Sequence, residues 1–244
     1  MIKLKVFENL KMLKQKIRYK PETTFVQQCF EQLQDDIIEG KLKPGEKIKV
    51  MPLKAKFGVA QSPIREALSR LVAVGLVETT ENKGFRVASI SEENIRDIYA
   101  TFTLIEDAAL RLSIKRGGKE WKNNIKREFK KIAAIESKKS SNYNEWSEQN
   151  YKFHYSLIAG CDSPELLKIH WNLYLKFERY VRMGYHISKN KSFTNYNESK
   201  RQDHIALTEL VLNREANKAV KLMTHHINAP LEDVIKALKT KKLI

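Results

Sequence analysis

Histidine is the residue type whose spacing in this sequence indicates a chemical site. All six histidines lie beyond residue 150: His154, His170, His186, His204, His225 and His226. Asn150 precedes His154 by four residues, so on a helix both side chains share one face and can converge on one point. His204 and His226 fall on the last two predicted helices. If these helices face a common cavity, three imidazoles and an amide oxygen can hold a divalent metal ion and leave one position open. Spacing alone does not decide this, because helical histidines are more commonly surface or hydrogen-bonded core residues.

The helices that must position these side chains occupy the second half of the chain. Ser91 can cap a helix, and Glu92 and Glu93 follow in its first turn. Helical periodicity then continues to the end, which predicts helices at residues 91–116, 119–139, 143–160, 163–187, 194–213 and 214–239. Pro230 is expected to kink or interrupt the last of these.

Residues 51–87 have the pattern of two short helices joined by a tight turn, followed by a hairpin. Gly58 permits the backbone conformation that such a turn needs. Ser62 directly before Pro63 predicts an N-cap followed by proline at the first helical position. The second helix has a predicted buried face made of Ile64, Ala67, Leu68, Leu71, Val72 and Leu76.

The start of this second helix has the residue types that read DNA. Gln61, Ser62 and Arg65 lie at its exposed beginning, where Arg and Gln can make paired hydrogen bonds to base edges. A free helix N-terminus also accepts phosphate. Residues 76–80 and 85–87 alternate like strands around a turn at 81–84. These elements together predict a winged helix-turn-helix.

Composition is typical of a soluble globular protein of one or two domains. The chain has 244 residues, of which 42% are hydrophobic and 30% charged. No apolar run approaches the roughly 18–20 residues of a membrane span, and Met1-Ile2-Lys3-Leu4 has no signal-peptide core. Cys29 and Cys161 are far apart and form no CxxC motif, which favours packed thiols in a reducing compartment. We therefore expect a cytoplasmic protein without membrane attachment.

The net charge of +16 favours polyanionic partners but does not locate their binding site. Residues 1–20 contain seven Lys or Arg and one Glu, and a second basic block lies within residues 111–139. Residues 21–90, in contrast, hold ten basic and nine acidic side chains. The basic lead of residues 1–24 fits a short amphipathic helix, an arm that approaches phosphates, or a solvated tail.

Residues 25–90 resemble the DNA-binding domain of the GntR family of bacterial transcription regulators. The resemblance rests on Pro44-Gly45, Gly58-Val59, the run Ser62-Pro63-Ile64-Arg65-Glu66-Ala67-Leu68, Leu71, Gly75-Leu76-Val77 and Gly84. It implies DNA contacts at Gln61, Ser62 and Arg65, and at Lys83 and Gly84 in the wing. The family commonly has Ser-Arg where this chain has Ala60-Gln61, which implies a different operator preference.

Residues 91–235 are similar to the FCD effector domain. In the FadR-like branch of the GntR family, this all-α domain follows the DNA-binding domain. The matching residues are Ile105-Glu106, Ala108-Ala109, Asn150 with Phe153-His154, and His204 followed by His226. The resemblance implies a divalent metal ion, zinc first and nickel or manganese as alternatives, held by Asn150, His154, His204 and His226. His225 is the adjacent alternative but points about 100° away on a helix. Asn150 stands where Asp is frequent, so weaker metal binding is expected.

The resemblance also implies a small carboxylic-acid effector near the metal. Phe102 replaces an arginine that commonly faces the effector carboxylate in this family. Arg179 and Arg182 are the candidate replacements, with a solvated helix face as the other explanation for both. Aromatic residues at helical spacing between Trp146 and Tyr180 fit core packing or the lining of an effector cavity.

The expected fold is mainly α: a lead at 1–24, a winged helix-turn-helix at 25–90 and an all-α effector-binding and dimerisation bundle at 91–244. The expected function is that of a homodimeric transcription regulator, a repressor, which reads an inverted-repeat operator in double-stranded DNA and responds to a small acid. Two alternatives stay open. One is a metal-dependent hydrolase with a DNA-binding head, and the other is a non-specific architectural DNA-binding protein.

Overall fold

The structure is a computed structural model that describes residues 24–80, 84–137, 143–188 and 193–244. The basic lead at 1–23 and Lys83 of the wing therefore lie outside the described residues. Within them the chain forms two compact units, one of residues 24–37 with 41–88 and one of residues 38–40 with 89–244. Each unit is described by itself.

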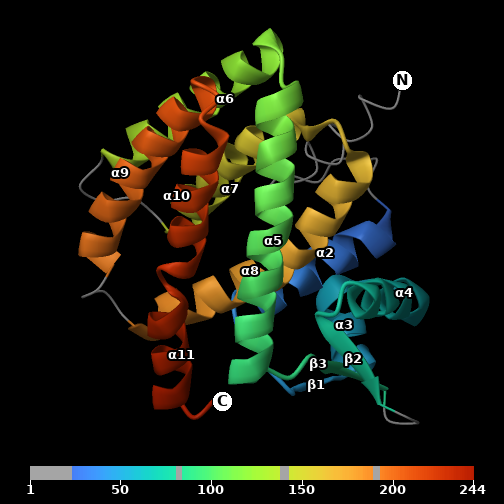
Figure 1. Ribbon diagram of the computed structural model, residues 1–244. Helices are drawn as coiled ribbons and strands as arrows, with labels where there is room; N and C mark the ends of the chain where they lie inside the picture. The colour runs from blue at the N-terminus through green and yellow to red at the C-terminus, as the bar shows by residue number, and fades with distance from the viewer. Residues whose placement is uncertain (1–23, 81–83, 138–142, 189–192) are drawn as a thin grey trace. The chain divides into compact units, whose positions relative to one another are not determined.

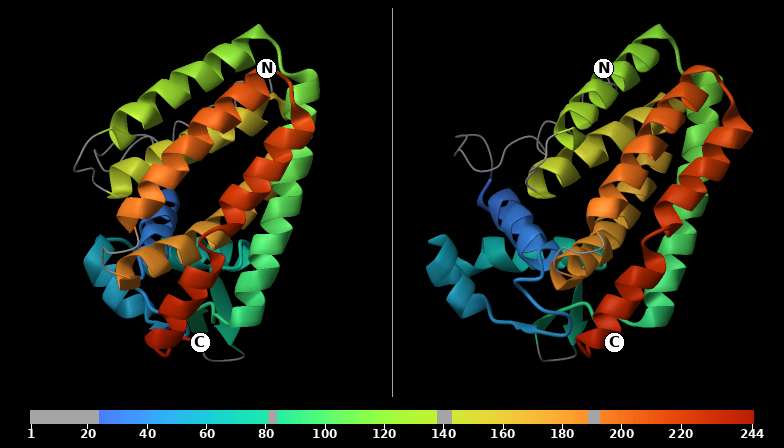
Figure 2. Two further views of the ribbon diagram at one scale, coloured as in Figure 1. Left: turned by 60° about the vertical axis from the view of Figure 1, so that its left-hand side comes forward. Right: turned by 90° about the vertical axis from the view of Figure 1, so that its left-hand side faces the viewer.

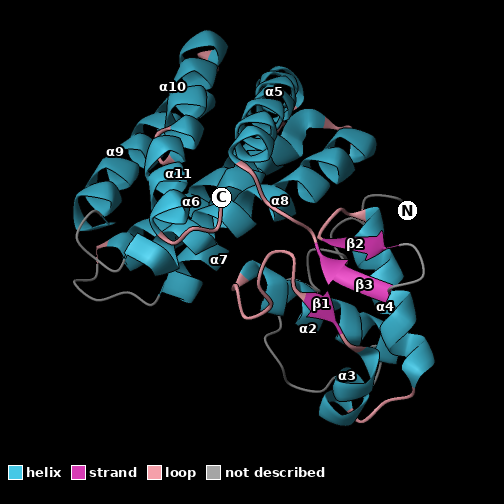
Figure 3. Ribbon diagram, turned by 90° about the horizontal axis from the view of Figure 1, so that it is seen from below, coloured by secondary structure: helices cyan, strands magenta, loops and turns pink. Residues whose placement is uncertain are grey.

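The first unit combines three helices with a small sheet. Its elements in chain order are α2 (Phe25–Ile38), β1 (Lys47–Ile48), α3 (Val50–Phe57), α4 (Gln61–Ala73), β2 (Val77–Thr80) and β3 (Gly84–Val87). The sheet is antiparallel with the order β1-β3-β2, as the strands in Figure 3 show. β3 pairs with both neighbours, so that Ile48 faces Phe85 on one side and Thr79 faces Phe85 on the other. The prediction of a two-stranded wing missed β1, and β2 begins at Val77 rather than at Leu76.

The turn between α3 and α4 has the conformation that glycine favours. Gly58 has φ of 66° and donates its backbone N–H to the Lys54 carbonyl at 3.0 Å, which ends α3. The prediction for the start of α4 was wrong. Ala60 is the N-cap, and Gln61 and Ser62 already have helical geometry. Pro63 is therefore in the third helical position, where its missing N–H still belongs to the first turn and breaks no helical hydrogen bond.

The buried face of α4 matches four of the six predicted residues, whereas Val72 is half-buried and Leu76 is buried beyond the end of the helix. Ile64, Ala67, Leu68 and Leu71 are all fully buried. α4 packs against α3 and β2, and Leu33, Leu53 and Val87 are buried in the same unit. This core fixes which side of α4 remains exposed.

The second unit is a helical bundle. It contains α5 (Glu92–Arg116), α6 (Lys119–Glu136), α7 (Tyr143–Ile158), the short 3-10 helix η1 (Ala159–Cys161), α8 (Pro164–Ser188), α9 (Phe193–Leu212), α10 (Ala216–Asn228) and α11 (Leu231–Thr240). Ser91 caps α5 by accepting the Asn94 N–H at 3.1 Å, as its sequence predicts. The predicted last helix is in fact two, because the chain breaks between Asn228 and Leu231 around Pro230.

The bundle packs around one apolar core. α5 packs against α8 and α10, α6 packs against α7 and α9, and α9 packs against α10. Figure 1 and Figure 2 both show α10 running alongside the long helix α5. Tyr99, Ile125, Phe153 and Leu207, from four different helices, are all buried in this core. Within the described ranges, no helix is both long and apolar enough to cross a membrane.

Candidate functional site

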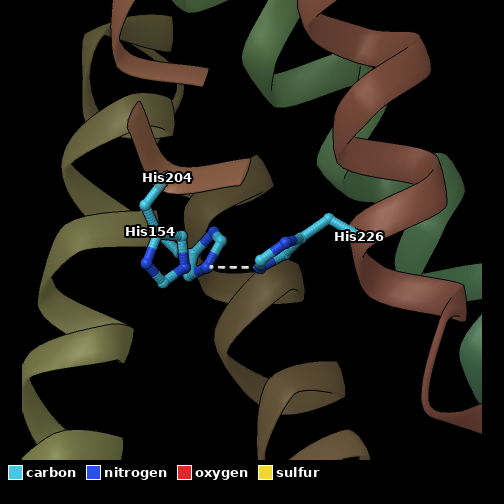
Figure 4. Close-up of side chains that lie close together, drawn as sticks. All are labelled: His154, His204 and His226. Carbon is cyan, nitrogen blue, oxygen red and sulfur yellow. Dashed lines mark hydrogen bonds between the residues drawn. The ribbon is translucent and has the colours of Figure 1, made fainter. Parts of the chain in front are cut away.

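Three of the six histidines meet inside the bundle. His154 on α7, His204 on α9 and His226 on α10 each offer a ring nitrogen, and these three atoms lie within 4.8 Å of one another. Nε2 of His226 lies 3.2 Å from Nε2 of His154, and the three rings converge from their separate helices in Figure 4. His204 and His226 are buried, whereas the adjacent His225 is exposed. The structure therefore brings together three of the predicted ligands and leaves His225 outside.

Carboxylates lie behind two of the three rings, and the one behind His226 makes a hydrogen bond to it. Nδ1 of His226 lies 2.8 Å from Oδ2 of Asp203, and Nδ1 of His204 lies 3.0 Å from Oε1 of Glu136. The Trp146 indole N–H donates to the same Glu136 oxygen at 3.0 Å. A carboxylate behind an imidazole fixes the ring and raises its basicity, which is the usual arrangement around histidine metal ligands. Glu136 was not among the residues singled out in the sequence.

Burial favours the neutral form of His154 and of His226. It lowers the pKa of His154 well below the usual range, and the positive charges of His204 and Lys200 act in the same direction. The pKa of His226 is likewise lowered by burial, with Lys200 and His154 as further causes. Neutral imidazole is the form that binds metal, because its lone pair is free.

Asn150 adds an oxygen to this cluster. Its Oδ1 is buried and has no hydrogen-bond partner among the described residues, and its side chain lines the same cavity as His154 and His226. A buried amide oxygen without a partner is costly unless a ligand completes it. Three imidazoles with one amide oxygen are a donor set that suits zinc, nickel or manganese. The residues present thus fit a divalent metal ion.

Lys200 is a buried cation that sequence reasoning missed. Its ammonium donates to the backbone carbonyl of His226, its side chain lines the cavity, and burial lowers its pKa to about 7. Lys200 precedes His204 by four residues, as Asn150 precedes His154. That shared spacing is the signal that places both polar residues one turn from a ligand on the same helix face.

The cavity beside the histidines has largely aromatic walls. It encloses about 630 Å³ of empty space, its open mouth included. The lining includes Phe102 of α5, Tyr151 of α7, and Tyr174 and Phe177 of α8. Of the aromatic residues that were expected in the core or in a cavity wall, Phe153 is core and Tyr151, Tyr174 and Phe177 are wall.

The two arginines predicted to meet an effector lie on α8 outside this lining. Arg179 is buried. Arg182 donates to Oε1 of Glu178 at 2.7 Å and to Oδ1 of Asn144 at 3.2 Å. Glu178 does line the cavity, so Arg182 can influence a bound ligand only through its ion pair with that carboxylate.

The first turns of α4 present the predicted DNA-reading residues. Gln61, Ser62 and Arg65 are exposed, and Gln61 donates to Sδ of Met51 at 2.9 Å. Arg70, farther along the helix, pairs with Glu66 at 2.6 Å. Gly84 begins β3 with φ of 86°, a conformation that favours glycine over other residues at the wing.

Family models match both units. The family described as "Bacterial regulatory proteins, gntR family" matches residues 25–87, and the FCD domain matches residues 97–229, more than half of the chain. The chain belongs to the GntR family. It is a GntR regulator with a C-terminal FCD domain, of the FadR-like subfamily.

Two curated relatives align over most of this GntR regulator. The HTH-type transcriptional regulator BphR of Paraburkholderia xenovorans is 31% identical over 86% of this chain and 85% of its own length. The HTH-type transcriptional repressor GlaR of Escherichia coli is 32% identical over 84% of this chain and 94% of its own. Among solved structures, E. coli McbR/YncC superposes with a TM-score of 0.73 at 15% identity, over 88% of this chain and 98% of that one. This last likeness shows the fold.

Family membership settles the class of function. The GntR regulator is a DNA-binding transcription regulator, and its family is not enzymatic. The hydrolase alternative is therefore wrong, and a purely architectural role does not fit a family of regulators.

Proposed function

We propose that this GntR regulator is a homodimeric repressor whose operator binding is controlled by a small carboxylic acid bound beside a divalent metal ion in the FCD bundle. The observation that carries the proposal is the convergence of His154, His204 and His226 from three helices at the edge of an aromatic cavity. A metal ion held there would supply a positive charge beside largely aromatic walls, where a carboxylate binds strongly.

The proposed DNA contacts are Gln61, Ser62 and Arg65 of α4, with Lys83 and Gly84 of the wing. Three features support the helix contacts: α4 buries one face, its opposite face starts with polar residues, and Arg65 is exposed. The guanidinium of Arg65 makes no ion pair with the described residues, unlike that of Arg70, so it is available to a base edge. In a homodimer two such helices would read the two halves of an inverted repeat.

The proposed metal ligands are Asn150, His154, His204 and His226, and zinc is the metal proposed first. Nickel and manganese are compatible with the same donors. Asn150 brings no charge, so the four ligands are neutral and the site keeps the full charge of the ion. That charge favours an anionic effector in the position left open.

Lys200 joins Arg179 and Arg182 as a candidate for effector binding. Unlike the two arginines, Lys200 lines the cavity directly. A carboxylate beside it would favour the protonated amine and raise a pKa that burial holds at about 7. Effector binding would thereby add an ion pair between α9 and the ligand, which is a differential contact of the kind that shifts a conformational equilibrium.

Repression is proposed because a similar protein, GlaR of E. coli, is named a repressor. The test is fluorescence anisotropy with the zinc-loaded protein, the DNA upstream of its own gene and a scrambled duplex, at physiological salt. We expect at least tenfold preference for the upstream DNA, relieved by one acid of a panel of small carboxylic acids. Expression of a reporter behind the same DNA then separates repression from activation.

Equal binding to both duplexes calls for selection from random DNA. Failure of that selection to yield a motif would overturn sequence-specific reading by α4. If specific binding is found but no acid alters it in wild type, the metal-linked effector part of the proposal is wrong and the DNA-reading part stands.

A further inference from the structure

Two buried polar atoms of the FCD cavity lack partners and are not metal ligands. The hydroxyl of Tyr151 and Nδ1 of His170 are both buried without a hydrogen-bond partner among the described residues. Both side chains line the cavity, and they are only 6% and 2% exposed, respectively. Buried polar groups are normally paired, so two unpaired ones in one cavity indicate the chemistry of a missing ligand.

His170 is held in a defined orientation by Glu106. Nε2 of His170 lies 2.6 Å from Oε2 of Glu106, and both residues are 2% exposed. An ionised carboxylate can only accept hydrogen bonds, so the shared proton sits on Nε2. In the tautomer that donates from Nε2, Nδ1 carries the lone pair and is an acceptor. Through this buried pair, α5 and α8 together present one hydrogen-bond acceptor to the cavity.

Tyr151 supplies the complementary group. Its ring packs against Tyr174 at 4.3 Å between centroids, and its phenol O–H has a proton to donate. The cavity thus offers one donor, the Tyr151 hydroxyl, and one acceptor, Nδ1 of His170, and neither has a hydrogen-bond partner among the described residues.

A hydroxyl group matches this pair, because it accepts from one partner and donates to the other. A carboxylate or a carbonyl can only accept, so it would leave Nδ1 of His170 unpaired. The polar pair therefore selects for a hydroxyl and against a second acid group.

The walls between the polar groups are flat and aromatic. The rings of Phe102 and Phe177 stack with centroids 4.7 Å apart and an interplanar angle of 18°, and Phe102 also lies 5.1 Å from the ring of His170. Offset stacking against such a wall favours a planar ring over a flexible chain.

We infer that Tyr151 and His170 bind a hydroxyl group of the effector, and that the effector is a hydroxylated aromatic monocarboxylic acid. The inference rests on the proposed function in one respect, namely that this cavity binds the effector. Beyond that function, the hydroxyl is the substituent that the protein recognises, and Tyr151 and His170 are the residues that recognise it. Tyr151 donates to the ligand hydroxyl, His170 accepts from it, and Glu106 positions His170.

The test compares ligands that differ by one hydroxyl. Titration calorimetry of the zinc-loaded, full-length protein is run with benzoate and with 2-, 3- and 4-hydroxybenzoate. We expect one hydroxybenzoate to bind at least tenfold more tightly than benzoate, because a site built to hydrogen-bond a hydroxyl discriminates strongly against its absence. Terephthalate, which carries a second carboxylate, is expected to bind more weakly than that isomer.

Tyr151→Phe removes only the hydroxyl, and Tyr155→Phe is its matched control. Tyr155 lies one turn away on α7 and is not among the residues that line the cavity. In Tyr151→Phe the preferred hydroxybenzoate should fall to within about threefold of benzoate, while benzoate itself is unchanged. The Tm of the ligand-free variant should be equal to or higher than wild type, because an unpaired buried hydroxyl has been removed. A purely structural role for the hydroxyl would instead lower the Tm.

The outcomes separate this inference from the proposed function. Equal binding of benzoate and all three hydroxybenzoates, no binding of any of them, or an unchanged preference in Tyr151→Phe overturns the hydroxyl assignment. Operator binding by the ligand-free protein is measured on the same samples, and its loss would count against the proposed function alone.

Discussion

Oδ2 of Asp203 lies 2.8 Å from Nδ1 of His226, so the carboxylate decides which nitrogen of that ring faces the cluster. The proton shared with Asp203 is on Nδ1, and Nε2 is left with a free lone pair directed toward Nε2 of His154, 3.2 Å away. Asp203 precedes His204 in the chain, so α9 supplies one ligand and also orients the ligand of α10.

Removing this carboxylate should weaken metal binding without abolishing it. We expect Asp203→Ala to lower zinc affinity about 10- to 100-fold, because His226 loses the partner that fixes its tautomer and raises its basicity. Competition with a chromophoric chelator measures the affinity. Asp233→Ala, an exposed acid on α11, removes the same charge and should leave the affinity within about twofold of wild type.

Loss of a ligand should have a larger effect. His154→Ala, His204→Ala and His226→Ala are each expected to abolish stoichiometric zinc binding, measured by elemental analysis after dialysis. His225→Ala is the control, since His225 neighbours a ligand but is exposed. Retention of one zinc per chain in all three variants would show that the cluster is not the metal site.

Two arginines of α4, the helix proposed to read DNA, give a prediction and its control. Arg65→Ala should lose roughly 1–3 kcal/mol of operator discrimination, the value of one paired contact to a base. Arg70→Ala should lose much less, because Arg70 is already engaged with Glu66 at 2.6 Å. Anisotropy with operator and scrambled DNA gives both numbers. Full discrimination by Arg65→Ala would mean that α4 does not read the bases through this residue.

Acid should loosen the contact between α6 and α7 through Glu128. Burial alone would raise the pKa of Glu128, but hydrogen bonds from Lys131, Gln149 and Arg127 together lower it. A carboxyl whose folded pKa is lowered stabilises the fold above its unfolded pKa of about 4.3, and this contribution is lost as pH falls through the folded value. We expect the contribution of this group to the free energy of unfolding to be lost as pH falls below about 4.3 and through the lower folded pKa.

Glu128→Gln tests that linkage directly. The variant should be less stable than wild type at pH 7, and the difference should shrink as pH falls, because wild type then loses the charge that the variant never had. Urea unfolding at a series of pH values measures it. A difference that is constant with pH would assign the effect to packing rather than to the carboxylate charge.

Much of the fold follows from hydrophobic periodicity and from the residues that begin and end helices in the sequence. Gly58 and Ser91 end and begin helices where their conformational and capping properties indicate. Ser62 does not, because the helix starts two residues earlier than predicted and Ala60 takes the cap position without a side-chain bond. β1 has only two residues and exists because β3 pairs with it, so no local pattern could reveal it.

The candidate site also contains residues that the sequence reveals and residues that it does not. Asn150 and His154 are linked by helical spacing, but spacing alone left their grouping with His204 and His226 open, and the resemblance to a family was needed to favour it. Glu136 and Lys200 were missed because each looks like a solvated charge on its own helix. Their burial is created by neighbouring helices that come from distant parts of the chain, and such information is absent from local spacing.

His154 and His226 are 72 residues apart in the chain, yet their ring nitrogens are 3.2 Å apart. A metal ion shared by them closes a loop that contains α8 and α9, as a long-range disulfide would in a secreted protein. Such a cross-link limits the unfolded chain most when the loop is long. The ion would therefore join α7, α9 and α10 into one cooperative unit, and the supply of metal in the cell would set how much of this regulator survives proteolysis as well as how it senses its effector.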